Sequence, residues 1–314
     1  MNDYIEQDEP LDLEERTDKV SFDKWIQYPD GRVYPSQSAT MLNKLTSGLY
    51  KAIFDRDKGM DYLIKLSIKT DDLLDLGNSD ADMIFNECKQ FWNSKDIYEH
   101  YKFVHKRGIL MMGAPGTGKT SIINKSLQWF LENIKGVAIL ITNEDELASY
   151  CRIHKTVFRS IETDRPMTVI MEDIDNYIGD SYNVSKILNI LDGFDQVGSV
   201  MHIATTNSPE KLPTTLTERP GRFDIKLEIS NPNHKERKKY ILEKIPTLTQ
   251  DELKNWIDVT QDMSMAYLGE MVKQYLIYKL PFDKIKDNIR KFDEVAESSH
   301  QFNKRRKAIG FSNG

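Results

Sequence analysis

Cysteine is scarce in this chain, which has only Cys88 and Cys151 among its 314 residues. So few cysteines exclude a disulfide-rich secreted scaffold and favour reduced thiols in a cytoplasmic compartment. The six histidines lack metal-ligand spacing, so they indicate no histidine metal centre. Apolar runs stay well short of the roughly 18–20 residues that cross a bilayer, and we therefore expect no membrane partner. The opening residues, MNDYIEQDEP, are too acidic for a signal or transit peptide.

An excess of positive charge is also lacking. Lysine and arginine number 43 against 49 acidic residues, which gives a formal net charge of −6. The surface as a whole therefore does not indicate a nucleic-acid-binding protein. Hydrophobic residues make up 39% and charged residues 29%, as expected for a globular chain with a substantial core.

Changes in composition divide the chain into five parts. Residues 1–20 carry eight acidic side chains and predict a flexible acidic tail. Residues 21–80 predict a small α+β leader, with several glycines and a proline between its apolar pieces. We expect a large α/β domain at 81–231, a small helical domain at 232–297 and a flexible basic tail at 298–314.

The large domain is predicted to contain a parallel sheet. Short apolar segments alternate with helical ones, and the expected strands cover 108–112, 137–142, 167–171, 200–206 and 225–229. Nearly continuous apolar strands joined by helical crossovers are typical of a parallel sheet covered by helices on both faces. After Pro232 the strands stop, and the remaining pattern is helical.

The strongest motif follows the first of these strands and opens the next helix. It reads GAPGTGKT and matches G-x-x-x-x-G-K-[ST], the Walker A phosphate-binding loop. Its backbone N–H groups and the helix N-terminus would surround the phosphates of ATP, with Lys119 at the β- and γ-phosphates and Thr120 at Mg²⁺. The predicted nucleotide-binding residues of this loop are Gly113, Ala114, Pro115, Gly116, Thr117, Gly118, Lys119, Thr120 and Ser121.

Two adjacent carboxylates, Glu172 and Asp173, follow the expected strand at 167–171. Such a pair is typical of a Walker B element, although the usual order is Asp then Glu. If the strand continues through both residues, the two side chains point to opposite sides and cannot exchange roles. We expect Glu172 to face the Mg²⁺ shell and Asp173 to polarise the attacking water. Asp175 could cap the next helix or help to order the site, and capping is the favoured interpretation.

Three further residues complete the predicted site. Asn207 ends the strand at 200–206, where its amide would orient the attacking water beside the γ-phosphate. Arg219 and Arg222 follow in the sequence RPGRFD, and their guanidinium groups suit the charge that develops on a transferred phosphoryl group. Their place in the sequence predicts arginine fingers that act on the nucleotide of an adjacent subunit.

With these elements in order, the chain resembles AAA+ ATPases, and within them the AAA clade proper. The Glu-Asp order, together with FVHKRGILMMGAPGTGKT and ILNILDGFDQVGSVMHIATTN, resembles the branch of the mitochondrial Rieske-protein translocase and of phage and large-virus ATPases. The resemblance covers about residues 80–279. It implies an AAA+ core with a helical lid and a homo-oligomeric ring, commonly a hexamer. By position, Ile241 and Ala266 match residues that line the adenine pocket or act as the lid sensor.

The resemblance leaves three functions open. The favoured one is an ATP-driven protein remodeller or assembly chaperone. A nucleic-acid motor or loader of viral or phage replication is the second, supported by the basic residues Lys304–Lys307. A slow nucleotide-gated switch is the third, because Asp173 is shorter than the usual glutamate and the aromatic–aliphatic–glycine pore loop of threading members is missing. Tyr150 and Tyr182 are the remaining candidates for a pore lining.

Overall fold

The computed structural model describes most of the chain between residues 22 and 289. The described residues are 22–27, 33–37, 44–56, 59–68, 79–154, 158, 162, 164–179, 181–192 and 199–289. Both predicted tails, including Lys304–Lys307, lie outside them. The chain divides into two units, Met1–Leu45 and Thr46–Gly314. In the first unit, β1 (Phe22–Gln27) pairs antiparallel with β2 (Val33–Gln37).

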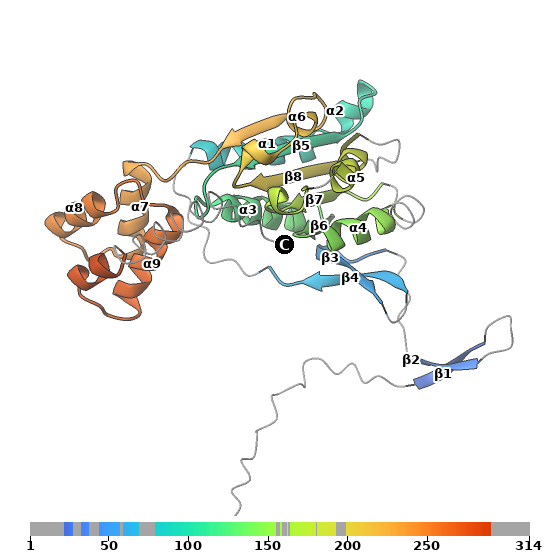
Figure 1. Cartoon of the computed structure of the whole chain (residues 1–314), viewed down its shortest axis with the longest axis horizontal. Coiled ribbons are helices and arrows are strands. Elements are labelled where there is room, and N and C mark those ends of the chain that lie inside the picture. The colour runs from blue at the N-terminus through green and yellow to red at the C-terminus, as the bar shows by residue number, and fades with distance from the viewer. Residues whose placement is uncertain are drawn as a thin grey trace, which may run out of the picture. The chain divides into compact units, whose positions relative to one another are not determined.

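The second unit is built on a seven-stranded sheet with the order β4-β3-β6-β7-β8-β5-β9 (Figure 1). Every neighbouring pair is parallel except β3 and β4, which are antiparallel. The strands are β3 (Gly48–Asp55), β4 (Met60–Leu66), β5 (Lys106–Met112), β6 (Val137–Ile141), β7 (Met167–Met171), β8 (Val200–Thr206) and β9 (Ile225–Glu228). The predicted parallel α/β fold is thus confirmed.

The sheet takes two strands from the stretch that was expected to form a leader at 21–80. Gly48, Leu49 and Tyr50 of β3 pair with β6, and this pairing attaches the β3–β4 hairpin to the edge of the nucleotide domain. The leader is therefore shared between the two units, and the unit boundary falls before Thr46. The composition of the sequence did not predict that β3 and β4 belong to the large sheet, because pairing between distant strands leaves no local signal.

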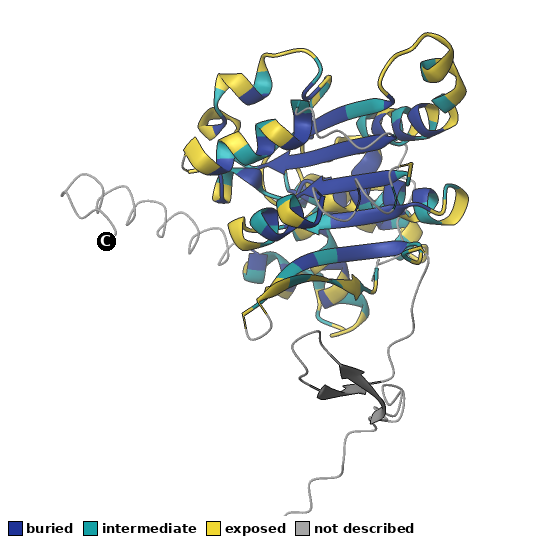
Figure 2. Ribbon diagram, turned by 90° about the vertical axis from the view of Figure 1, so that its right-hand side faces the viewer, coloured by how far each residue is buried: buried dark blue, intermediate teal, exposed yellow. Residues whose placement is uncertain are grey.

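Helices cover both faces of the sheet. On one face, apolar side chains of α1 (Ser79–Asn93) and α3 (Lys119–Asn133) join the strands in one core cluster. On the other face α4 (Glu144–Ile153) packs on β3 and against α5 (Ser181–Asp192). The central strands are buried, and exposed residues lie on the outer helix surfaces and the hairpin (Figure 2). Shorter helical segments are α2 (Lys95–His100), η2 (Ile174–Asn176), η3 (Pro209–Lys211) and α6 (Thr214–Thr217).

The predicted helical domain follows β9 and has its own core around Trp256 and Leu268. It contains α7 (His234–Lys244), α8 (Gln250–Val259) and α9 (Met265–Leu276), followed by a helical segment at 282–289. The side chains of Asn233, Thr249 and Ser264 cap the three helices, and each cap contributes about 1 kcal/mol. In the part of the chain that the structure describes, no helix is long and apolar enough to cross a membrane.

His202 makes the stability of the large domain sensitive to pH. It lies on the central strand β8 at 1% exposure, and its Nδ1 has no hydrogen-bond partner among the described residues. Burial lowers the pKa of His202 from 6.5 to about 3, with smaller contributions from Lys106 and His154. The folded protein therefore keeps this imidazole neutral at a pH where the unfolded chain protonates it.

We expect this histidine to lower the free energy of unfolding by about 2 kcal/mol between about pH 7.5 and about pH 5. The sign follows from the depressed pKa: the stability is present above the unfolded-state value of 6.5 and is lost as the pH falls toward about 3. Over the same pH interval, the free energy of unfolding of a His202→Leu variant should fall by about 2 kcal/mol less than that of the wild type. Urea denaturation of both proteins at the two pH values measures the difference, and equal losses would contradict the assignment.

Candidate nucleotide-binding site

The predicted phosphate loop lies between β5 and α3, as the motif requires. Gly116 and Gly118 have positive φ angles of 81° and 103°, a left-handed conformation that glycine adopts without strain. Gly118 is the N-cap of α3 and provides no side-chain cap, so the first N–H groups of the helix stay available for an anion. The Thr117 hydroxyl donates to the Ala114 carbonyl at 3.0 Å and closes the loop on itself.

Lys119 lies beneath this loop at 6% exposure. Its ammonium group donates to the carbonyls of Gly113 and Ala114 at 2.6 and 3.0 Å, and to Asn207 Oδ1 at 2.8 Å. Burial lowers the pKa of Lys119, and the nearby carboxylates of Asp173 and Asp175 oppose that shift. The three bonds use the full donor capacity of the ammonium and hold it beside the end of β8.

Glu172 and Asp173 lie beyond the end of β7, which stops at Met171. The strand ends where the sequence predicted, so the alternation of side chains along a strand does not apply to the two acids, and Asp173 adopts a left-handed backbone conformation with φ 48° and ψ 52°. The turn nevertheless sends the two carboxylates to different partners. Glu172 Oε1 accepts a hydrogen bond from the Thr120 hydroxyl at 3.0 Å, and Asp173 Oδ1 accepts one from Asn207 Nδ2 at 2.9 Å.

The Thr120–Glu172 pair has the chemistry of a magnesium site. A hydroxyl and a carboxylate are hard oxygen ligands, and they lie 3.0 Å apart at the N-terminus of α3. Mg²⁺ is commonly held by one or two protein oxygens together with waters and phosphate oxygens. Within the described residues, no group of three or more His, Cys, Asp or Glu side chains could hold a metal. The residues present therefore fit a metal ion that arrives with a nucleotide.

Asp175 orders the site and does not cap the next helix. Its side chain is 3% exposed, and its Oδ1 accepts from the Thr206 hydroxyl at 2.7 Å and from the backbone N–H of Asn207 at 3.2 Å. These bonds fix the turn that carries Asn207. The favoured capping interpretation is wrong because Asp175 lies within η2 and bonds at the end of β8, whereas α5 begins only at Ser181.

The two predicted lid residues lie in different surroundings. The backbone N–H of Ala266 donates to the Gly116 carbonyl at 3.1 Å, so the N-terminus of α9 contacts the phosphate loop directly. A Cβ atom at Gly116 would lie only 2.9 Å from Ala266 Cβ, which shows how closely the two backbones approach. Ile241 is fully buried within the lid core, and its assignment to an adenine pocket stays a prediction.

The two predicted arginines also differ in burial and in their partners. Arg222 is 7% exposed, and its guanidinium bonds to Asp192 at the end of α5 and to the Thr215 carbonyl. In this conformation the donors of Arg222 bond within its own chain, and its role at a neighbouring nucleotide stays a prediction. Arg219 is 69% exposed, with Asp192 Oδ2 at 3.9 Å from its Nη1.

The two tyrosines considered for a pore differ in the same way. Tyr150 of α4 is fully buried, and its hydroxyl bonds to His154 Nδ1 at 3.1 Å, so it does not line a pore in this conformation. Tyr182 is 68% exposed, and Lys186 Nζ lies 4.1 Å from the centre of its ring.

A phosphate loop before a helix, a hydroxyl–carboxylate pair and a strand-end asparagine on one edge of a parallel sheet define a P-loop nucleotide-binding domain. Residues 109–231 match the family model described as the ATPase family associated with various cellular activities (AAA). Over these residues the chain is similar to AAA ATPases, as its motifs predicted, and the match supports ATP hydrolysis as the reaction class. The finer likeness to the translocase and viral branch stays a prediction.

The chain is also similar to several other proteins over part of its length. The chain is 32% identical to the 26S proteasome regulatory subunit S10B homolog B of Arabidopsis thaliana over 143 residues, which are 42% of this chain and 36% of the relative. It is 27% identical to the vesicular-fusion protein SEC18 of Candida albicans over 234 residues, 65% of this chain and 28% of the relative. It is 26% identical to the ATP-dependent zinc metalloprotease FtsH of Marinobacter nauticus over 232 residues, which are 65% of this chain and 34% of the relative. The matches thus span about a third of each relative's length.

The arginine assignment can be tested by stability. Replacing Arg222 with alanine should lower the free energy of unfolding by about 2–3 kcal/mol, because Asp192 loses the buried half of its ion pair and Thr215 loses a donor. The matched change Arg219→Ala should stay within about 0.5 kcal/mol, since that side chain is exposed. Urea titration followed by circular dichroism compares the two, and equal effects would reject the distinction.

Proposed function

We propose that the chain is a Mg²⁺-dependent ATP hydrolase that works as a ring and remodels or assembles protein partners. The supporting observation is the continuous set of hydrogen bonds that joins Lys119, Asn207 and Asp173 at the ends of three neighbouring elements. In this proposal Lys119 and the loop N–H groups bind the phosphates. Thr120 and Glu172 hold the metal, which would neutralise phosphate charge. Asp173 and Asn207 orient and polarise the attacking water.

The ring part of the proposal rests on Arg219. This guanidinium is exposed at the end of α6, and its ion pair with Asp192 is long, at 3.9 Å. An exposed cation that is weakly held can reach outward to phosphate charge on a second copy. A head-to-tail contact that repeats by rotation closes into a ring. We propose six subunits, the number that the family resemblance implies.

A protein substrate agrees with the relatives' names, which include a proteasome regulatory subunit and an ATP-dependent protease.

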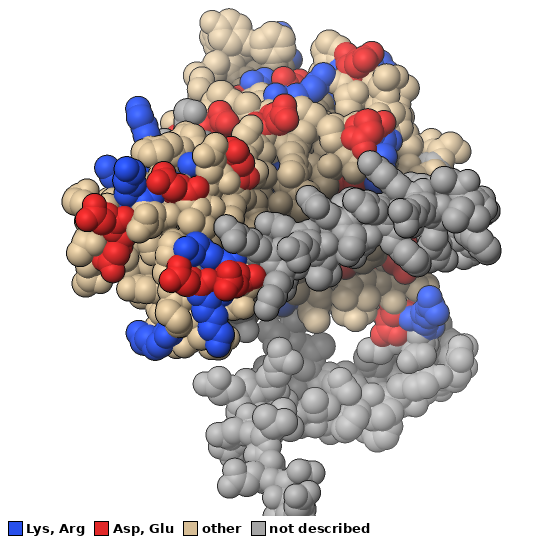
Figure 3. Space-filling model, turned by 60° about the vertical axis from the view of Figure 1, so that its left-hand side comes forward, with Lys and Arg blue, Asp and Glu red and all other residues tan. Residues whose placement is uncertain are grey.

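The distribution of charge on the described residues gives less support to a nucleic-acid motor. Acidic and basic side chains are interspersed over the face shown in Figure 3. Hydrolysis stimulated by single-stranded DNA, and lost steeply with salt, would favour the motor. Tight ATP binding with negligible turnover would favour the switch.

The division between the two acids predicts a specific variant. Asp173→Asn keeps an oxygen that accepts from Asn207 Nδ2 but removes the charge that polarises water. We expect ATP binding to be retained while kcat falls by about 100-fold or more. A fluorescent ATP analogue measures binding, and phosphate release measures turnover. Hydrolysis at the wild-type rate would remove Asp173 from the reaction.

The trans role of Arg219 predicts that two inactive variants complement each other. Arg219→Ala subunits have an intact site but no finger, whereas Asp173→Asn subunits have a finger but an inactive site. Random equal mixing should restore about a quarter of wild-type hydrolysis, because about one interface in four pairs a working site with a working finger. The double variant mixed with Arg219→Ala is the matched control and should stay inactive. No recovery in the first mixture would overturn the trans assignment.

A further inference from the structure

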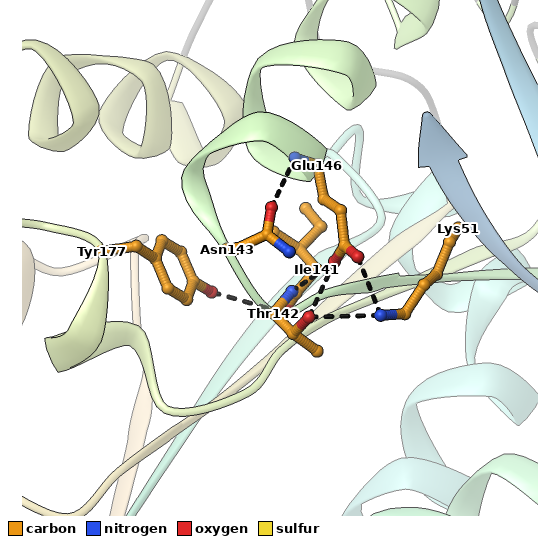
Figure 4. Close-up of polar contacts among 6 residues, drawn as sticks. All are labelled: Lys51, Ile141, Thr142, Asn143, Glu146 and Tyr177. Carbon is orange, nitrogen blue, oxygen red and sulfur yellow. Dashed lines mark hydrogen bonds and ion pairs between the residues drawn. The ribbon is translucent and has the colours of Figure 1, made fainter. Parts of the chain in front are cut away.

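An ion pair outside the predicted site joins the β3–β4 hairpin to the first turn of α4, beside the carboxyl end of β6 (Figure 4). Lys51 Nζ of β3 donates to Glu146 Oε1 of α4 at 2.8 Å and to the Thr142 hydroxyl at 3.2 Å. Glu146 Oε2 accepts from the backbone N–H of Thr142 at 2.7 Å and from its hydroxyl at 2.9 Å. The Glu146 side chain is only 12% exposed, so these bonds are poorly screened by solvent.

The backbone pairing between β3 and β6 ends just before this ion pair. Its register runs from Gly48 with Val137 to Tyr50 with Ile139. Beyond Tyr50 the side chain of Lys51 continues the connection between the two strands. At the other end of the contact, Asn143 caps α4 by accepting from the N–H of Glu146. The short turn between β6 and α4 is therefore held at both ends.

This turn adjoins the metal side of the candidate site. The Ile141 carbonyl, directly before Thr142, accepts from the backbone N–H of Glu172 at 3.0 Å and from the buried Tyr177 hydroxyl at 3.4 Å. Glu172 in turn accepts from Thr120 at 3.0 Å. A continuous chain of bonds thus runs from the hairpin to the carboxylate expected at Mg²⁺.

We propose that Lys51 and Glu146 are positioning residues that set the place of Glu172 and thereby the affinity of the site for Mg²⁺. This inference rests on the proposed function, since it assigns Glu172 to the metal. The β3–β4 hairpin is then part of the catalytic unit, because its Lys51 charge fixes the turn that fixes the Glu172 backbone. A ligand that pulled on the hairpin would act first on the metal half of the site.

The test compares two ion pairs that both tie the hairpin to α4. Arg152 bonds to Asp61 of β4 at 2.7 and 2.8 Å, near the end of α4 that is farther along the chain from Thr142. Lys51→Met should raise the Mg²⁺ concentration that half-saturates binding of a fluorescent ATP analogue by about 10-fold, as loss of outer-shell support does. Arg152→Met should change it by less than about 2-fold, and Lys51→Arg should recover most of the wild-type value.

Binding as the readout keeps this inference separate from hydrolysis. A wild-type chain that binds the analogue with Mg²⁺ but turns over no ATP would fail the proposed function and still allow this comparison. Equal shifts in Lys51→Met and Arg152→Met would show only a loosened hairpin and would overturn the inference, as would an unchanged Lys51→Met. If Lys51→Met does not fold, Glu146→Gln removes the charge while keeping an acceptor for Thr142, and the same shift is expected.

Discussion

The side chain of Asn207 is the interaction on which the candidate site depends. Its oxygen accepts from the buried ammonium of Lys119, and its amide group donates to Asp173. Only one orientation of the amide allows this, because an ammonium cannot accept a hydrogen bond and a carboxylate cannot donate one. The neutral amide thus separates the two charges while bonding to both. Hydrogen bonds to charged groups contribute about 1.5–3 kcal/mol each, which helps to offset the cost of burying Lys119.

The order of strands explains why these groups meet. The registers of β7, β8 and β5 bring Met171, Thr206 and Met112 to the same edge of the sheet. Each functional residue follows the carboxyl end of its strand, and parallel strands present those ends together. Asp175 then fixes the turn after β8 through two acceptor bonds, so Asn207 is held from behind as well as by its own partners.

Local patterns predicted the strands and the position of the phosphate loop, because apolar runs and motif spacing are properties of short segments. They failed where the outcome depends on which segments pack together. Arg222 and Arg219 are equivalent in the sequence and both lie near Asp192, yet only Arg222 is buried and also bonds to the Thr215 carbonyl. Tyr150 belongs to a polar stretch but faces the core. The left-handed turn at Asp173 likewise has no glycine to reveal it.

The hairpin and the lid contact the nucleotide site at different groups. The lid reaches Gly116 through the backbone of Ala266, on the phosphate side of the loop. The hairpin reaches Glu172 through Lys51, Glu146 and the turn after β6, on the metal side. Tertiary contacts transmit displacement only through groups that are in contact, so movement of the lid would act first on phosphate binding. Movement of the hairpin would act first on the acid that we assign to Mg²⁺.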